Sequence, residues 1–150
     1  MEFDEQGNLF PYQIIETDTL IFQEVFVINF ATSNSRFKLY QKFNLYIEEL
    51  KQLLFGSFYV WIDGSFITQK PHPRDIDILI FVESSVLIKK EKELTLLKNK
   101  FKPEMDSYFI EILPKDHPRY FLFEINRKEW FFTFSTARNF RNKGILQINY

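Results

Sequence analysis

The chain has no cysteine, only four glycines among 150 residues, and a formal net charge of −1. The absence of cysteine excludes disulfides and thiolate metal sites and fits a reducing cytoplasm, which is the location we expect. The near-zero charge argues against the broad basic surface that nucleic-acid binding needs, so nucleic acid is not an expected partner. No apolar run is long enough to span a membrane, and the acidic start MEFDEQGNLF lacks the basic region and apolar core of a signal peptide.

Apolar residues are abundant: they make up 45% of the chain, and 19 of them are phenylalanine. A chain of 150 residues with this composition has enough material for one core, and we predict a single domain over residues 1–150. The simpler interpretation of the phenylalanines is an aromatic core. The alternative is that some of them are exposed and form a protein interface or stack on bases.

Residues 61–81, WIDGSFITQKPHPRDIDILIF, organise the rest of the chain. The apolar run at 58–62 predicts a buried strand that ends at Gly64. A glycine at a strand exit allows a sharp turn or a close approach of the backbone to a ligand. Ser65 follows and can open a helical turn whose N–H groups favour an anion. The pair predicts a seat for a phosphate group.

A cationic loop and a second strand follow this turn. The loop 68–74 contains two prolines together with Lys70, His72 and Arg74, so it should hold no regular element. Asp75 and Asp77 then open an apolar run, and residues two apart in a strand point to the same face. Carboxylates held this close repel each other, which a divalent cation relieves, and such oxygen ligands suit magnesium.

These residues together resemble the signature of the polymerase-β-type nucleotidyltransferase superfamily: Gly64-Ser65, nine intervening residues, then Asp75-x-Asp77 at the head of an apolar strand. The chain is most similar to the minimal, single-domain bacterial members, which resemble the antitoxin halves of some toxin–antitoxin pairs. The likeness covers residues 59–112, about fifty positions, and none of its parts is specific alone. It implies a nucleotidyltransferase-like fold with a core at about residues 36–113.

The resemblance also implies roles for individual residues. Gly64 and Ser65 would bind the triphosphate of a nucleotide, with Lys70 and Arg74 adding positive charge on the leaving group. Asp75 and Asp77 would hold two magnesium ions. The family uses a third carboxylate from a following strand, for which Asp106 is the candidate and Glu111 the reserve. A chain of this length has no room for the domains with which polymerases grip a template, so we expect a hydroxyl on a protein or small molecule as the acceptor.

Other interpretations of the same residues stay open. A Gly-Ser pair can be an ordinary turn, and an Asp-x-Asp can cap a loop or form half of a surface salt bridge. The Asp-x-Asp could also open a calcium-binding loop, but the glycine and the distal glutamate of that motif are missing here. Glycosyltransferases also bind metal through an Asp-x-Asp, but without an upstream Gly-Ser. The main alternative is a catalytically silent member of the fold that binds a protein, such as a cognate toxin.

Apolar periodicity predicts the remaining elements and an α+β fold, in which a small mixed sheet is flanked by helices. Residues 1–16 should be an irregular lead-in, and residues 20–30 suit a helix better than a strand. The clearest helix runs from Arg36 to Phe55, with Gly56 as its C-cap. A second helix closes at Pro103. The strand at 105–112, the helix at 120–134 and a short strand at 145–148 complete the set.

Some polar residues stay ambiguous in sequence. On the predicted strand 105–112, Asp106 and Tyr108 share one face, whereas Glu111 lies on the other. His117 sits in a proline-flanked turn and should be a surface residue. Arg138, Arg141 and Lys143 form a basic turn that we expect to solubilise the tail rather than to bind phosphate.

Overall fold

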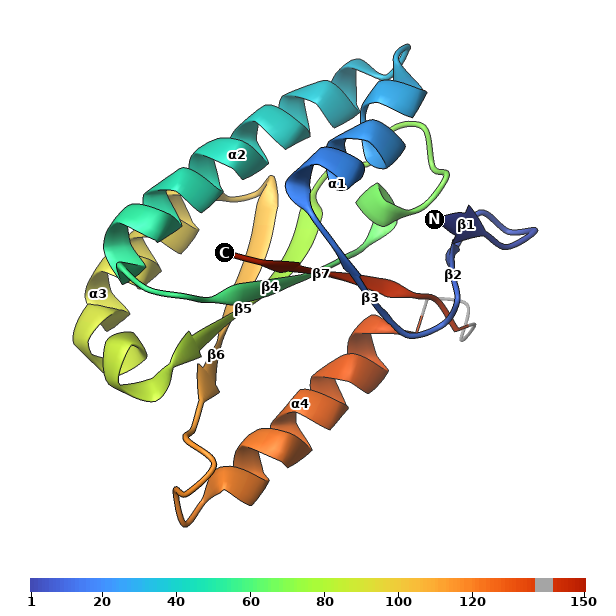
Figure 1. Cartoon of the computed structure of the whole chain (residues 1–150). Coiled ribbons are helices and arrows are strands. Elements are labelled where there is room, and N and C mark those ends of the chain that lie inside the picture. The colour runs from blue at the N-terminus through green and yellow to red at the C-terminus, as the bar shows by residue number, and fades with distance from the viewer. Residues whose placement is uncertain (137–141) are drawn as a thin grey trace.

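The computed structural model of the chain describes residues 1–136 and 142–150 and confirms the α+β class (Figure 1). Its centre is a five-stranded mixed sheet with the strand order β3-β7-β4-β5-β6. The two parallel pairs, β3 with β7 and β5 with β6, flank antiparallel pairings of β4 with β7 and β5. These strands are β3 (Ile14–Thr17), β4 (Tyr59–Asp63), β5 (Ile76–Glu83), β6 (Met105–Ile112) and β7 (Ile145–Asn149).

The N-terminal segment is more regular than its sequence predicts. Short strands β1 (Glu2–Phe3) and β2 (Leu9–Phe10) pair as a hairpin, and β3 becomes the sheet edge beside β7. The expectation of an irregular lead-in was therefore wrong. A two-residue strand carries no readable periodicity, and β3 is defined by its pairing with residues that lie at the other end of the chain.

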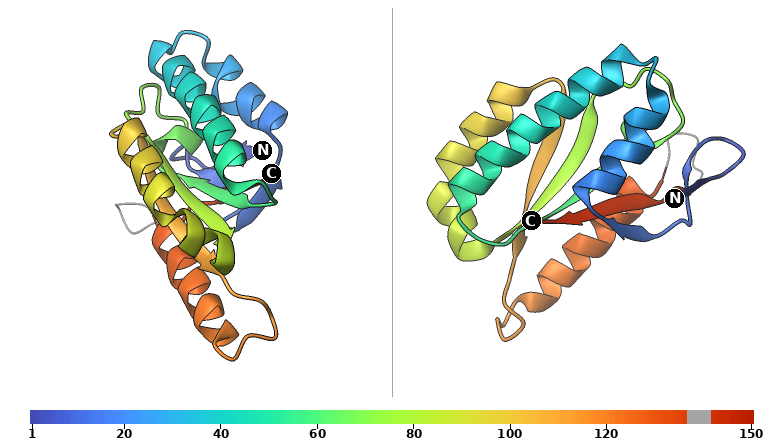
Figure 2. Two further views of the ribbon diagram at one scale, coloured as in Figure 1. Left: turned by 90° about the vertical axis from the view of Figure 1, so that its left-hand side faces the viewer. Right: turned by 45° about the horizontal axis from the view of Figure 1, so that its top comes forward.

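Helices cover both faces of the sheet (Figures 1 and 2). Helices α1 (Thr19–Phe26), α2 (Asn34–Leu54) and α3 (Ser84–Phe101) lie over one face, and α4 (Tyr120–Phe134) lies over the other. These helices confirm the predictions made from periodicity, including the choice of helix over strand after Asp18, whose carboxylate caps α1 by accepting the Ile21 N–H. Helix α3 is the crossover that connects parallel strands β5 and β6.

One predicted cap is misplaced by a residue. The C-cap of α2 is Phe55, which adopts a left-handed conformation with φ of 49° and donates its N–H to the Lys51 carbonyl. Gly56 was expected in this role, but its φ is not positive. Phe55 is 86% exposed, so the helix ends with an aromatic side chain in solvent rather than with a glycine.

The core is rich in phenylalanine, as the composition predicts. Phe22, Phe26, Phe43, Phe66 and Phe81 are fully buried. The larger cluster lies between the sheet and helices α1 to α3, and a smaller one, built around Trp61, lies under α4. No helix among the described residues is long and apolar enough to cross a membrane.

Strand alternation decides which side chains face each layer. Ile62 and Ile78 pack in the larger cluster, whereas Trp61 and Leu79 pack under α4. Since residues two apart share a face, Asp63 and Asp77 continue the α4 side of the sheet just where β4 ends and β5 begins. The apolar pattern therefore leaves two carboxylates side by side at one end of the sheet.

Candidate functional site

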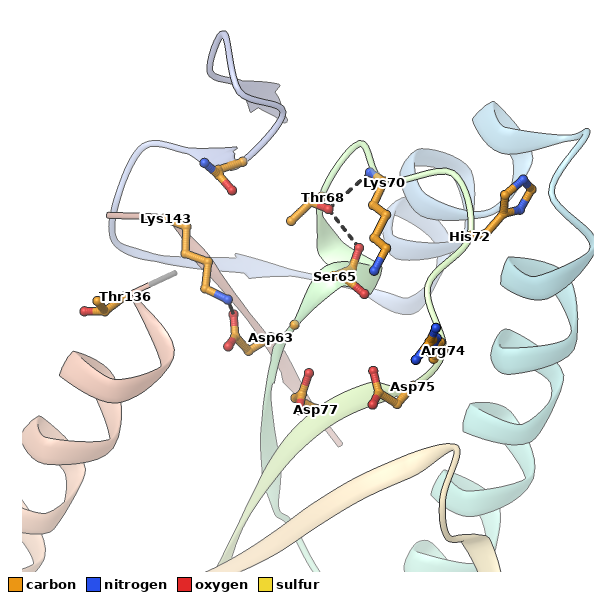
Figure 3. Close-up of a pocket in the computed structure, with 12 residues that line it drawn as sticks. Asp63, Ser65, Thr68, Lys70, His72, Arg74, Asp75, Asp77, Thr136 and Lys143 are labelled. Atoms are coloured by element: carbon orange, nitrogen blue, oxygen red, sulfur yellow. Dashed lines mark hydrogen bonds and ion pairs between the residues drawn. The ribbon is translucent and has the colours of Figure 1, made fainter. Parts of the chain in front are cut away.

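A pocket of about 620 Å³ opens at this end of the sheet (Figure 3). Its walls come from the β1–β2 hairpin, the turn and loop after β4 and the start of β5, together with Thr136 and Lys143. The structure brings together most of the residues that the sequence singled out. The predicted residues that line the pocket are Gly64, Ser65, Lys70, His72, Arg74, Asp75 and Asp77.

Gly64 and Asp77 are in direct contact across the pocket floor. Gly64 has a φ of 81°, and a Cβ built on it would lie 1.8 Å from Oδ2 of Asp77. Only glycine fits here, because any side chain would occupy the position of the carboxylate. The short 3-10 helix η2 (Ser65–Ile67) begins immediately afterwards, as expected for a helical turn opened by Ser65.

Three aspartates occupy neighbouring register positions on three adjacent strands beside this turn. Asp77 pairs with Asp63 in the β4–β5 register and with Asp106 in the β5–β6 register. Burial, together with the charges of Asp75, Asp63 and Asp106, raises the pKa of Asp77 to about 6, and Lys143 opposes this rise. The raised pKa of Asp77 marks a group of carboxylates whose mutual repulsion a bound cation would relieve.

The register separates the two candidates for a third carboxylate. Asp106 is directly opposite Asp77, although it does not line the pocket itself. Glu111 pairs with Val82 and accepts a hydrogen bond from the Ser84 hydroxyl. It lies about 17 Å farther along β6, at roughly 3.3 Å per residue. Of the two, only Asp106 can join the aspartate cluster.

The donor set of the cluster fits magnesium. In the described ranges, no three acidic or histidine side chains converge closely enough to form a ready-made metal site. Magnesium does not need one, because it typically takes one or two protein carboxylates and completes its shell with water and substrate phosphates. Asp75 and Asp77, which line the pocket side by side (Figure 3), supply such a pair.

Lys143 is a pocket residue rather than part of a solvated tail. Its Nζ lies 2.7 Å from Oδ1 of Asp63, and both side chains are about one-tenth exposed. The expectation that Lys143 only solubilises the tail was therefore wrong, because β7 carries the lysine back beside β4. Arg138 and Arg141, which were grouped with it, lie outside the described residues. Burial raises the pKa of Asp63 above its ordinary value, although the charge of Lys143 opposes this rise.

Sequence reasoning missed Asp63, although its place directly before Gly64 at the end of an apolar strand was a usable signal. It also missed Arg36, for which no signal exists, because an arginine in the first turn of an amphipathic helix looks solvated. The two histidines lie apart: His72 lines the pocket, whereas His117 Nδ1 accepts the Arg119 N–H in the turn before α4.

Arg36 anchors the loop that carries the pocket cations. Its fully buried guanidinium donates to the carbonyl oxygens of Phe66, Thr68 and Lys70, at 2.6 to 2.7 Å for the shortest contacts. It also donates to the Phe26 carbonyl at 2.9 Å. Burial lowers the pKa of Arg36 to about 10, so the group stays charged at neutral pH. The loop 66–70 is therefore held through its backbone.

Fold and pocket together define an α+β protein with a carboxylate cluster facing a glycine turn. The chain belongs to a family of unknown function, DUF6932, whose model matches residues 1–149. No curated protein and no solved structure matches it.

Proposed function

We propose that the chain is a magnesium-dependent nucleotidyltransferase with a nucleotidyltransferase-like fold. It moves a nucleoside monophosphate from a nucleoside triphosphate, such as ATP, to a hydroxyl of a protein or small molecule. The direct contact between Gly64 and Asp77 carries this proposal. A glycine turn packed against one member of the Asp75–Asp77 carboxylate pair supports binding of a metal–triphosphate complex.

The phosphates would bind over Gly64 and Ser65, both of which line the pocket. Lys70 and Arg74 line the same pocket and are exposed, so they can reach the charge of the leaving pyrophosphate. The pocket volume of about 620 Å³ lies in the range of small-molecule sites.

Asp75 and Asp77 would hold the magnesium ions, with Asp106 beside them. When bound, these ions would activate the acceptor hydroxyl and neutralise charge on the departing pyrophosphate. The chain's own residues supply position: Arg36 fixes the loop, and the β-sheet register fixes Asp77 against Asp106. Asp106 can accept the proton of the attacking hydroxyl.

Binding and transfer can be measured separately. Calorimetry with a non-hydrolysable triphosphate analogue, with magnesium and with EDTA, should show binding only when magnesium is present. Transfer is measured with the four α-labelled nucleoside triphosphates in a lysate of the source organism. Both signals should vanish in Asp75→Asn/Asp77→Asn and persist in Asp116→Asn, which changes an exposed aspartate in a turn. Absence of magnesium-dependent nucleotide binding in the wild type would refute the proposal.

One observation favours the alternative of a protein-binding module. The outer face of α4 exposes four large apolar side chains: Phe121 (57%), Leu122 (45%), Ile125 (49%) and Phe132 (72%). Contiguous exposed apolar side chains commonly mark interaction sites. Under this alternative, α4 binds a protein such as a cognate toxin while the pocket is silent. Phe121→Ser/Phe132→Ser would then abolish binding of the partner, and Asp75→Asn/Asp77→Asn would leave the protein's biological effect unchanged.

A further inference from the structure

Tyr108 reaches the aspartate cluster from β6. It lies two residues after Asp106 on the same strand, so the two side chains share a face. Its hydroxyl donates a hydrogen bond to Oδ2 of Asp106 over 3.4 Å. Asp106 in turn is the cross-strand neighbour of Asp77. A phenolic hydroxyl is thus connected to the carboxylates that we assign to the metal ions.

The ring of Tyr108 is held on two sides. The Trp130 ring from α4 packs against it at 5.3 Å between centroids, and Lys98 Nζ from α3 lies 4.2 Å from the ring centroid. Tyr108 is nevertheless 39% exposed. Its hydroxyl is therefore both positioned and accessible, which an acceptor group requires.

Two of the three hydroxyls that line the pocket donate to backbone carbonyls, and the third belongs to Ser65, to which the proposed function assigns the phosphates. Thr68 Oγ1 donates to the Ser65 carbonyl, and Thr136 Oγ1 donates to the Phe132 carbonyl. Among the hydrogen bonds in the described part of the chain, only that of Tyr108 runs from a hydroxyl to an aspartate of the cluster. A carboxylate partner can take a proton from an attacking hydroxyl, whereas a backbone carbonyl cannot.

We infer that Tyr108 is an acceptor within the chain, so that the protein nucleotidylates itself at this residue. The inference rests on the proposed function and names one acceptor for it. Oη of Tyr108 attacks the α-phosphorus of the bound triphosphate and forms a new O–P bond. The bond from the α-phosphorus to the oxygen that bridges to the β-phosphate breaks, and pyrophosphate leaves. The phenolic proton passes to the Asp106 carboxylate and then to solvent, leaving a tyrosyl phosphodiester.

The test uses the purified full chain, magnesium chloride and each of the four nucleoside triphosphates in turn. Intact-protein mass spectrometry should show the addition of one nucleoside monophosphate, and fragmentation should place it on Tyr108. The adduct should be lost in Tyr108→Phe, which keeps the ring contacts, and in Asp75→Asn/Asp77→Asn. It should persist in Tyr120→Phe, which removes another hydroxyl with a carboxylate partner, Glu124 on α4.

Each other outcome has a definite meaning. A wild-type protein that binds nucleotide with magnesium but gains no adduct would overturn the inference and leave the proposed function standing. An adduct that persists in Tyr108→Phe on another residue would also overturn it. A wild-type protein that neither binds nucleotide with magnesium nor transfers it to any acceptor would refute the proposed function itself. Equal thermal unfolding of Tyr108→Phe and wild type shows that a lost adduct does not reflect misfolding.

Discussion

A carboxylate oxygen of Asp77 occupies the space that a side chain at position 64 would need. The turn after β4 and the first residues of β5 are therefore a single steric unit, although 12 residues separate Gly64 from Asp77 along the chain. Changes on either side of this contact affect both the stability of the fold and the shape of the pocket.

Gly64→Ala should be strongly destabilising. Its φ of 81° and ψ of −169° are adopted readily only by glycine, and the strain costs roughly 1–3 kcal/mol before the clash with Asp77 is added. Chemical denaturation should show a loss of about 2 kcal/mol or more in the free energy of unfolding. Gly56→Ala is the matched control, because its nearest atom is the Leu54 carbonyl oxygen at 3.7 Å. Equal stability of the two variants would contradict the described turn.

Removal of Lys143 should leave a buried charge without its partner. Lys143→Met should lower the free energy of unfolding by about 3 kcal/mol, since breaking a buried ion pair on one side is costly. Asp63→Asn in the same chain should recover much of this loss, because the unpaired charge is then gone. The measurement is a double-mutant cycle by urea denaturation. Additive effects would show that the 2.7 Å contact carries no coupling energy.

The pKa of Asp77, about 6 in the folded chain against an ordinary 3.8, predicts a pH-dependent stability. The folded state disfavours the ionised carboxylate, so this group lowers stability as the pH rises from about 4 through 6. In EDTA, Asp77→Asn should therefore be more stable than wild type by about 1–2 kcal/mol at pH 7.5, a value reduced for solvent screening.

The Asp77→Asn difference should fade as the pH falls to 4, where the wild-type carboxyl is largely protonated. Thermal unfolding of both proteins at both pH values measures it. An Asp77→Asn variant less stable than wild type at pH 7.5 would show that the carboxylate is favoured in the fold rather than strained by its neighbours.

Arg36→Gln should destabilise the chain by about 3 kcal/mol or more. The substitution leaves several buried carbonyl oxygens without donors, each costing roughly 1–3 kcal/mol. Lys38→Gln, an exposed change on the same helix, should stay within about 0.5 kcal/mol of wild type. Hydrogen exchange should also quicken in residues 66–70 of Arg36→Gln. Unchanged exchange there would mean that the loop does not depend on this anchor.

Local patterns predicted most of the fold. Helix α2 has strong apolar periodicity, and strands β4 and β5 are continuous apolar runs. The predicted helices at 20–30 and 120–134 coincide with α1, η1 (Ile28–Phe30) and α4. The prediction of an irregular segment over residues 1–16 was wrong because β3 is specified by its pairing with β7, about 130 residues away. The predicted C-cap of α2 was wrong because Phe55 adopts the left-handed conformation that a sequence pattern assigns to glycine.

The pocket was predictable where its parts are close in sequence. Gly64, Ser65, Asp75 and Asp77 belong to one motif, and the structure brings them together with Lys70 and Arg74. Lys143 and Arg36 reach the site, or the loop beside it, from other elements, and neither residue is conspicuous in its own segment. Their roles depend on the order of strands in the sheet and on burial, which local sequence does not encode.

The anchor made by Arg36 donates its hydrogen bonds to main-chain oxygens at 66, 68 and 70 rather than to loop side chains. The exposed side chain at position 70 can therefore be exchanged while the backbone path stays the same, whereas Thr68 Oγ1 donates to the Ser65 carbonyl and accepts the Lys70 N–H. The shape of this wall and its chemistry are set by different residues. Variants at 70 can thus redirect what the pocket accepts without first having to rebuild it.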